Sequence, residues 1–421
     1  MTGTTGTEYS QPRQAEGRPQ PKRSALALAA LLLAVASAAV PLSLVKPWVG
    51  MGLWAVMLIG CVVLLRAMRV GVTLTLIASV AALALSGTYL FAGTLAAALC
   101  VGTFAGAFLM TTLKKPWLAC LIPLVSVGVT AIFTRDWLFL LAALSLLPAG
   151  ALTAFATRRG MGRTSVICYG AAGLLAAALL LCGLAVARTE AGLSVETVRE
   201  LFDGWKAKML AERIEMRDEL LTMLERLYAN SLPTAGTSAE KMLDSYRQLL
   251  SDANLEASLT ALFNVIPGLA VTIALIAAYL GQLLLLEGCD AAGARGCIKP
   301  ESEFLVVSLP AAILWTVCLV ISLVTESATV ASITAENLFL ALTPGLCAVG
   351  WHTLMRFFRA VPAQGRWILI LPAAAVVCCA STSAFYILAA YGAYGTVLSA
   401  VRRAMLRRGN PDPPDDGSDD D

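Results

Sequence analysis

Residues 70–113 read VGVTLTLIASVAALALSGTYLFAGTLAAALCVGTFAGAFLMTTL, a stretch of 44 residues without a single charge. As one α-helix this stretch would be about 66 Å long, whereas about 20 apolar residues are enough to cross the hydrocarbon core of a bilayer. It therefore has to hold two membrane-crossing helices, and Gly87 marks the break between them. In hydrocarbon, backbone N–H and C=O groups must pair within the segment, and runs rich in Leu, Ala and Val do so as helices.

The rest of the chain repeats this pattern. Of 421 residues, 58% are hydrophobic and only 14% are charged, whereas a soluble domain carries about 25% charged residues. The sequence therefore predicts an all-α fold, a polytopic transmembrane helical bundle of about eleven or twelve spans with an extramembrane helical hairpin as an insert. The predicted spans are 24–45, 48–65, 70–86, 89–113, 116–133, 137–157 and 164–187 before the insert, and 263–286, 304–325 and 335–358 after it.

The basic residues predict the orientation of these spans. Eleven lie before the first span or in the loops after the second, fourth and sixth, against two in the alternate loops. By the positive-inside rule the N-terminus is cytoplasmic, and residues 188–262, reached after seven crossings, are extracytoplasmic. We thus expect a multi-pass protein of the cell membrane. The eleven residues are Arg13, Arg18, Lys22, Arg23, Arg66, Arg69, Lys114, Lys115, Arg158, Arg159 and Arg163.

The insert, residues 188–262, has the pattern of amphipathic helices. Apolar residues recur at spacings near 3.6 from Val198 to Leu227, with Arg and Glu between them. Residues 230–238, with a proline and a glycine, predict a break, and Thr237 with Glu240 forms a capping box for a second helix. The apolar face has to dock on its partner helix, the membrane surface, a second copy or another protein. The candidate docking residues are Trp205, Met209, Leu220 and Leu224.

Residues 367–401 leave two alternatives. Four arginines between residues 402 and 408 favour a cytoplasmic C-terminus, but a single crossing from Arg366 puts them outside. A hairpin of two short or re-entrant helices turning near 381–383 places them inside, and one tilted helix leaves the C-terminus outside. With the hairpin favoured, the predicted organisation is a disordered cytoplasmic tail (1–23), a seven-span bundle (24–187), the extracytoplasmic insert (188–262), a C-terminal bundle (263–401) and a basic, then acidic, disordered tail (402–421).

The motifs that the sequence lacks exclude several functions. There is no GxxxxGK[ST], HExxH or GxSxG, and Gly160-Met161-Gly162 lacks the third glycine of a dinucleotide fingerprint. No charged residue falls in the middle of a predicted span, which argues against a proton-coupled pump acting alone. We therefore predict no enzyme, no cofactor, no metal centre and no nucleic-acid partner. Cys289 and Cys297 fall in one predicted loop, as reduced thiols, a disulfide or a metal contact.

The few polar candidates for a ligand site lie in the C-terminal half. Glu336 and Asn337 stand near the outer end of one span, where they either stabilise a helix N-terminus or form the rim of a pocket. His352 lies near the inner end of the same span, as an interfacial residue or as a pH-sensing or ligand-binding one. Gly102 and Gly106 form a GxxxG pattern, which serves close helix packing or self-dimerisation.

Short apolar motifs in the C-terminal half resemble those of a known family. They are Ile266-Pro267-Gly268, Leu309-Pro310 followed by Trp315, Asn337-Leu338-Phe339 followed by Gly350, and the ending YGAYGTVLSAVRR at 391–403. In these motifs the chain resembles the YybS-like family of predicted bacterial membrane proteins, a domain of unknown function. It departs from the family at Val349, where a glutamine is frequent, and at Tyr394 or Gly395, where an aspartate is frequent.

The resemblance and the excluded functions together suggest a role. The N-terminal half of such proteins is similar to the substrate-binding subunits of energy-coupling-factor vitamin transporters, which implies small-molecule capture with a separate ATPase. We therefore expect a non-enzymatic membrane protein that binds a small molecule or supports its transport. The alternative is a scaffold or sensor whose external segment docks another envelope protein. The expected partners are the lipid bilayer and either the ATPase or that envelope protein, and the oligomeric state is left open.

Overall fold

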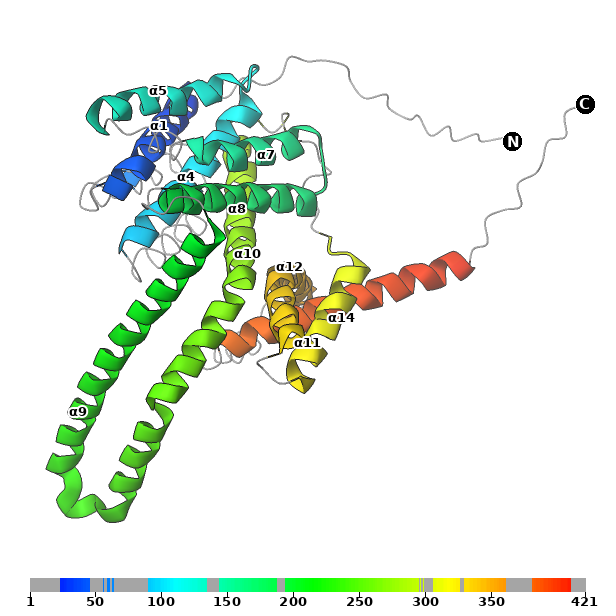
Figure 1. Ribbon diagram of the computed structural model, residues 1–421. Coiled ribbons are helices and arrows are strands. Elements are labelled where there is room, and N and C mark those ends of the chain that lie inside the picture. Colours follow the sequence, from blue (N-terminus) through cyan, green and yellow to red (C-terminus); the bar gives the residue numbers. More distant parts are fainter. Residues whose placement is uncertain are drawn as a thin grey trace, which may run out of the picture. The chain divides into compact units, whose positions relative to one another are not determined.

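The computed structural model describes residues 23–45, 56, 59–60, 63, 90–134, 144–187, 194–294, 296, 298, 306–325, 329–360 and 381–409. Within these ranges the chain forms helices and no strand, which confirms the predicted all-α fold (Figure 1). The helices are α1 Arg23–Val45, α4 Leu90–Thr112, α5 Leu118–Thr134, α7 Leu146–Arg158, α8 Arg163–Ala187, α9 Val195–Leu249, α10 Asp252–Ala291, α11 Leu309–Val324, α12 Val330–Ala360 and α14 Ser381–Gly409.

Three of the described helices are long and apolar enough to cross a bilayer, which is compatible with a membrane protein. They contain the segments Arg163–Leu184, Asp252–Asp290 and Val330–Leu354. Shorter apolar helices occur at Arg23–Ala39, Val101–Thr112 and Leu309–Val324. The predicted spans 48–65, apart from four isolated residues, and 70–86 lie outside the described residues, as do the two tails at 1–22 and 410–421. The number of spans therefore stays a prediction.

The helices divide into two compact units. The N-terminal unit comprises Met1–Ala178 and Ala277–Phe304, and the C-terminal unit comprises Leu179–Ile276 and Leu305–Asp421. In the N-terminal unit, buried side chains of α1, α4 and α10 share one core, with Leu33, Phe108 and Leu285 at most 1% exposed. The predicted domain boundaries follow membrane crossings rather than contacts, and they stay a prediction.

The GxxxG pattern of α4 serves packing inside the chain. A Cβ atom added to Gly102 would lie 2.9 Å from a methyl group of Leu146 in α7 and 3.2 Å from the Cβ atom of Ala36 in α1. One added to Gly106 would lie 3.9 Å from the Cα atom of Gly150. Small residues let the helices approach closely, as is common inside membrane bundles. This stripe is thus occupied within one molecule, which favours the packing alternative over self-dimerisation.

The turn between α7 and α8 follows from one glycine. Gly160 has a φ of 70°, and its N–H donates to Thr157 O while the Met161 N–H donates to Ala156 O. This is the Schellman arrangement, which requires a residue in the left-handed conformation just after the helix, and that residue is usually glycine. The predicted ends at 157 and 164 are within one residue of the observed ones. Gly160 thus ends α7, and α8 begins directly after Gly162.

In the C-terminal unit, α9 and α10 form a helical hairpin (Figure 1). Arg247 pairs with Glu225, although 22 residues of straight helix would hold them about 33 Å apart. Arg217 also reaches the Leu250 carbonyl, and the Phe202 and Phe263 rings lie 4.9 Å apart. The midpoints of these pairs, 225/247, 217/250 and 202/263, fall at residues 232 to 236. The chain therefore reverses where Pro233 and Gly236 stand, as the predicted hairpin requires.

The structure corrects one detail of this hairpin. The residues of the predicted break, 230–238, lie within the bounds of α9, Val195–Leu249, so the chain reverses inside this element rather than in a loop between two separate helices. The side chains of Thr237 and Glu240 are outside the described part, so the capping box stays a prediction. At the other end of α9, a cap that was not predicted is present: the Ser194 hydroxyl accepts from the Thr197 N–H at 3.0 Å. This bond satisfies one of the unpaired N–H groups of the first turn.

Helices α12 and α14 run in the same direction along their contact. The Cys347 thiol lies 3.1 Å from the Phe385 carbonyl, and farther along both helices Thr353 lies beside Gly395. Parallel packing puts the ends of α12 and α14 on the same side. A single helix over 367–401, running straight back from α12, would be antiparallel to it, so the observed packing favours the hairpin, and the number of crossings over 367–401 stays a prediction. The turn was expected near 381–383, where α14 begins, and the residues just before Ser381 lie outside the described part.

Three further boundaries differ from the predictions. Helix α14 continues to Gly409, so the four arginines that were assigned to a disordered tail at 402–421 belong to a helix. Cys289 lies in α10, fully buried, rather than in a loop, while Cys297 lies outside the described residues. Helix α10 begins at Asp252 and ends at Ala291, well beyond the predicted span of 263–286. Composition marks only the apolar part of a helix that continues into polar surroundings.

Candidate functional site

The structure does not bring the predicted ligand-site residues together. Glu336 and Asn337 are adjacent on α12, whereas His352 lies about 22 Å farther along the same helix and its side chain is exposed. The Ser332 hydroxyl lies 3.5 Å from a Glu336 carboxylate oxygen, one turn away on the same helix. Among the described residues, no group of three or more His, Cys, Asp and Glu side chains is arranged to hold a metal ion. No pocket is thus formed by these three residues.

Asn337 joins α12 to α10. Its Oδ1 atom accepts from the Gly268 N–H at 2.6 Å, and its Nδ2 atom donates to the Asn264 and Ile333 carbonyl oxygens at 2.8 Å each. In an uninterrupted helix the N–H of residue 268 and the carbonyl of residue 264 are partners. The Asn337 amide lies between them, next to Pro267, which has no N–H to donate. The side chain is thus used as a clamp between two helices, a role that the sequence pattern does not predict.

The other family-like motifs are also packing contacts. The Trp315 indole of α11 stacks on Phe339 of α12 with ring centroids 5.0 Å apart, and its N–H donates to the Thr343 hydroxyl at 3.0 Å. Phe339 in turn contacts the Tyr386 ring of α14 at 5.2 Å. Trp315 is 3% exposed, so its polar group is satisfied within the bundle. Trp315 and Phe339, each from one of the motifs on which the family resemblance rests, therefore belong to the core of the C-terminal unit.

The sequence pattern does not indicate that one of the predicted loop arginines is buried. Arg163, counted as a loop charge, is the first residue of α8 and is 7% exposed. Its Nε atom donates to the Gln282 Oε1 atom of α10 at 3.2 Å, and its guanidinium lies 5.3 Å from the Tyr279 ring centroid. Buried arginine needs such partners, because an unpaired buried charge is costly. Arg163 differs from Arg158 and Arg159 in its contact with Gln282, which lies 119 positions farther along the chain, and the sequence pattern does not reveal that contact.

The predicted docking residues divide between two environments. Trp205 and Leu220 are 53% and 46% exposed, whereas Met209 and Leu224 are half-buried. Trp205 lies edge-on to Phe263 of α10 at 5.5 Å, so one side of its ring contacts the second arm of the hairpin. Some of the four predicted docking residues thus pack between the two arms of the hairpin, and the others stay exposed.

Burial identifies the seam between the two arms. On the first arm the half-buried residues Leu210, Ile214, Arg217, Leu221 and Leu224 recur at alternating spacings of four and three. This spacing keeps side chains on one stripe that faces an antiparallel partner. On the second arm the corresponding seam residues are Leu243, Arg247 and Leu250, by their burial or by their contacts to the first arm.

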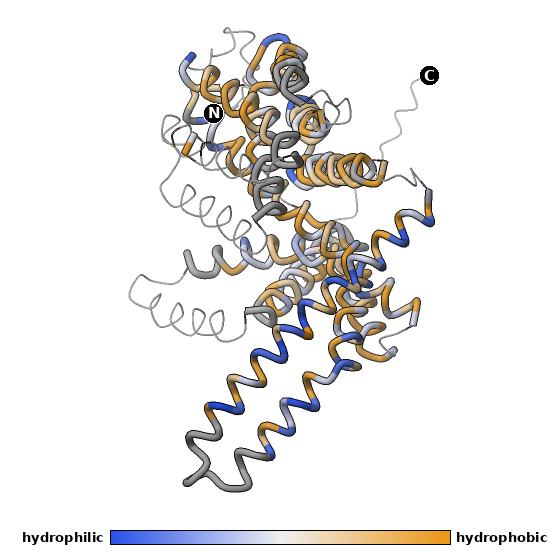
Figure 2. The backbone as a smooth tube through the Cα atoms, turned by 60° about the vertical axis from the view of Figure 1, so that its left-hand side comes forward, coloured by the Kyte–Doolittle hydropathy of each residue, from blue (hydrophilic) through white to orange (hydrophobic). Residues whose placement is uncertain are grey.

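The two exposed sides of the hairpin differ in character. On the first arm, the residue one position before a seam residue is apolar from Met216 onward, as at Leu220 and Met223, and the next one after it is polar or charged, as at Asp218 and Thr222. Nearer the start of α9, Arg213 and Ala211 are exceptions to this rule. The second arm follows the same rule. Each residue along a helix turns the side-chain direction by about 100° about the helix axis. In two antiparallel helices, the residues one position before the seam therefore lie on the same side of the pair in both arms. One side is therefore apolar and the other is charged, and Figure 2 shows both kinds of residue alternating along the arms.

Six exposed residues make up what we call the distal apolar face. Their exposed fractions range from 39% to 67%. The two arms match in height: the pairs 220/249, 223/246 and 227/242 share the midpoint of the cross-arm contacts. Apolar surface of this extent and alignment marks interaction sites on soluble proteins and domains. The six residues are Leu220, Met223, Leu227, Met242, Tyr246 and Leu249.

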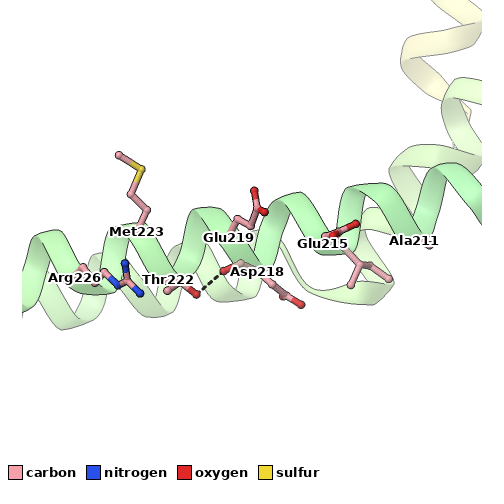
Figure 3. A pocket seen from close by; sticks show the side chains of 8 residues that line it. Ala211, Glu215, Asp218, Glu219, Thr222, Met223 and Arg226 are labelled. Atoms are coloured by element: carbon pink, nitrogen blue, oxygen red, sulfur yellow. Dashed lines mark hydrogen bonds between the residues drawn. The ribbon is translucent and has the colours of Figure 1, made fainter.

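The outer surface of the first arm holds a shallow depression that is not a ligand site (Figure 3). It is formed by one helix alone, and the Thr222 hydroxyl within it donates to the Asp218 carbonyl of the same helix at 2.7 Å. Small-molecule sites enclose their ligand with several elements, which this surface does not. Its lining residues are Ala211, Ile214, Glu215, Asp218, Glu219, Thr222, Met223 and Arg226.

Ion pairs hold the arms in register. Arg217, whose side chain is 16% exposed, pairs with Asp252 and with Asp218, and the hydrogen bond to Asp252 is the main cause of its raised pKa. Arg247 pairs with Glu225 across the seam at 2.7 Å and with Asp244 at 3.1 Å, and the bond to Glu225 raises its pKa most. Since both pKa values are raised, both guanidinium groups stay charged over the working range of pH, and their contribution is lost only in strong alkali.

These pairs predict a charge-exchange result. Arg247→Glu alone places a carboxylate beside Glu225 and is expected to lower the melting temperature slightly, because exposed pairs contribute little. The double variant Arg247→Glu with Glu225→Arg is expected to recover most of that loss. Thermal unfolding of both variants in detergent measures it. A double variant as unstable as the sum of its two single variants would mean that the two side chains do not interact.

Comparison with known proteins found no matching family model, no matching curated protein and no matching solved structure. The resemblance to the YybS-like family therefore stays a prediction from the motifs.

Proposed function

We propose that this chain is a non-enzymatic multi-pass membrane protein that acts as a scaffold, with its hairpin serving as a protein-docking element on the extracytoplasmic side. The observation that carries the proposal is the sidedness of the hairpin, with one apolar and one charged side on a pair of arms that ion pairs connect. A hairpin needed only as a connector between membrane helices has no reason to keep one exposed side apolar along both arms.

Contacts between helix ends support the proposed topology. Arg158, at the end of α7, donates from Nε to the Thr111 carbonyl of α4, so two predicted cytoplasmic ends meet. At the other membrane face, Asn337 and Gly268 join the predicted outer ends of α12 and α10. These contacts agree with the relative sidedness of the predicted spans, and the assignment of the cytoplasmic face rests on the positive-inside rule. The parallel packing of α12 and α14 is likewise what a cytoplasmic C-terminus requires.

Photocrosslinking in living cells tests the docking role. A benzoylphenylalanine in place of Leu220, on the apolar side, is expected to give protein adducts at least five-fold more abundant than the same group in place of Glu215, on the charged side. Equal labelling at the two positions, or no adduct at either, would mean that the apolar side docks no protein.

A separate measurement tests where the hairpin lies. A cysteine introduced in place of Ser231, near the chain reversal, is expected to react with a membrane-impermeant maleimide on intact cells, against a background set by the unmodified chain. If the cysteine reacts only after lysis, the segment is cytoplasmic and the proposed docking takes place on the other side of the membrane.

The small-molecule role expected from the family resemblance stays a prediction. Its polar candidates do not converge: the Asn337 amide is used between α12 and α10, and His352 is several turns away. Native mass spectrometry of the detergent-extracted protein would detect a retained small molecule or an associated ATPase. Because these readouts do not involve the hairpin, they are independent of the docking test.

A further inference from the structure

The occupant of the distal apolar face can be inferred from its symmetry and composition. We propose that a second copy of this chain covers the face, so that two hairpins form a four-helix bundle outside the membrane. This proposal rests on the proposed docking function and names the partner. It makes the apolar side of each hairpin the contact surface and leaves the charged side in water.

The membrane surface is too far away to cover this face. Leu249 lies 14 residues before Phe263, where the predicted span begins, and Met242 lies 21 residues before it. At 1.5 Å per residue these distances are about 21 Å and 31 Å along the second arm. The aromatic contacts at Phe263 lie at the other end of the hairpin, near the predicted membrane surface. The six residues therefore need a partner that reaches them in water.

Two copies in one membrane have the geometry to meet in this way. Both are inserted with the same orientation, so they can be related by a two-fold axis along the membrane normal. Rotation about that axis sets the first arm of one copy against the second arm of the other. Neighbouring helices in the bundle are then all antiparallel, as in common four-helix bundles. Because Met223 and Tyr246 stand at the same height, each meets the other across the interface.

The composition of the face suits a copy of itself. None of its six residues is charged, so the two-fold axis brings no like charges together. Nearer the membrane, the corresponding positions on the second arm are Asn254, Ser258 and Ala261, which are also uncharged. Charged residues do flank the face on the first arm: Glu212 and Arg213 lie nearer the membrane, at about the height of Ser258, and Glu219 projects beside Met223 (Figure 3). A face that selects a different protein usually carries charges that complement it.

The size of the surface is adequate for a dimer. From Val198 to Leu227 the first arm is about 45 Å long, and two helices side by side are about 20 Å wide. The whole side of the hairpin, of which the distal apolar face is the part farthest from Phe263, therefore offers about 900 Å² per copy, close to the roughly 800 Å² per partner of a stable interface. The GxxxG stripe of α4 is occupied within the chain, so it does not compete for this role.

Crosslinking between two tagged copies tests the proposal. Full-length chains carrying Met223→Cys with one tag and Tyr246→Cys with another are coexpressed, and membranes are treated with a short bis-maleimide. We expect a product that carries both tags, at least ten-fold above the yield from Glu215→Cys paired with Tyr246→Cys, with chains that lack the added cysteines as background. A product carrying both tags at the same yield in both pairs, or in neither, overturns the proposal.

A second measurement covers the case in which cysteines are unreactive. Single-molecule photobleaching in native membranes is expected to count two copies for the unmodified chain and for Thr222→Glu, on the charged side, but one for Met223→Glu. A single copy for the unmodified chain overturns the dimer. If Leu220 still gives adducts with a different protein in that case, the docking function stands with another partner. If it gives none, both proposals fail.

Discussion

Replacing Gly350 by alanine is expected to break the contact between α12 and α14, with a larger loss of stability than Arg247→Glu or Asn337→Ala causes. A Cβ atom added at Gly350 would overlap the Leu388 carbonyl oxygen, and one added at Gly392 would overlap the Leu346 carbonyl oxygen. Both obstacles are backbone atoms, so no rotation of a side chain relieves them. Overpacking of this kind costs about 3 kcal/mol, and at Gly350 it also separates the helices around the contact.

The measurement is thermal unfolding of the detergent-solubilised protein, followed by size-exclusion chromatography of the heated samples. The matched control is Gly345→Ala in the same helix, where an added Cβ atom would lie 3.7 Å from a methyl group of Val307, an ordinary contact. We expect Gly345→Ala to unfold at nearly the same temperature as the unmodified protein and Gly350→Ala to unfold well below it. Equal stability of the two variants would show that α12 and α14 do not approach at Gly350.

The sequence predicted several of the described apolar helices because long apolar runs favour helices. The end of α7 and the start of α8 were predicted within a residue, since arginines and Gly160 mark them. The start of α10 was placed at Phe263 rather than Asp252, because residues 252–262 mix polar and apolar side chains, and apolar composition no longer distinguishes that part of the helix. The end of α14 at Gly409 was missed for the same reason.

The side-chain contacts were not predictable in the same way. Arg163 and Gln282, like Asn337 and Gly268, are far apart in the chain, and neither pair leaves a periodic signal. In the hairpin, the amphipathic spacing is visible in the sequence, but both the seam between the arms and the exposed apolar face have this spacing. Burial was needed to decide that Leu224 belongs to the seam and Leu220 to the open side. Because one seam residue, Arg217, is charged, a prediction based on hydropathy alone does not recognise the seam.

Asn337→Ala is expected to have the second largest effect, through the clamp between α12 and α10. It removes three hydrogen bonds and leaves the Gly268 N–H and the Asn264 carbonyl without the side chain that lies between them. Such bonds inside membrane proteins contribute roughly 0.6 kcal/mol each, and unsatisfied backbone groups add to the loss, so the expected cost is about 2 kcal/mol. Unlike the substitution of Gly350, it introduces no overlap.

Two companion variants separate the clamp from a general effect of losing an amide. Asn264→Ala keeps the backbone carbonyl that the clamp uses and is expected to be nearly neutral. Asn337→Asp retains an acceptor for the Gly268 N–H but has no donor for the Asn264 and Ile333 carbonyl oxygens, so it is expected to be at least as unstable as Asn337→Ala. Thermal unfolding in the same detergent ranks the three. If Asn337→Asp matched the unmodified protein, the two donated bonds would contribute nothing, and the joint at Pro267 would have to be held by the packing of α10 against α12 alone.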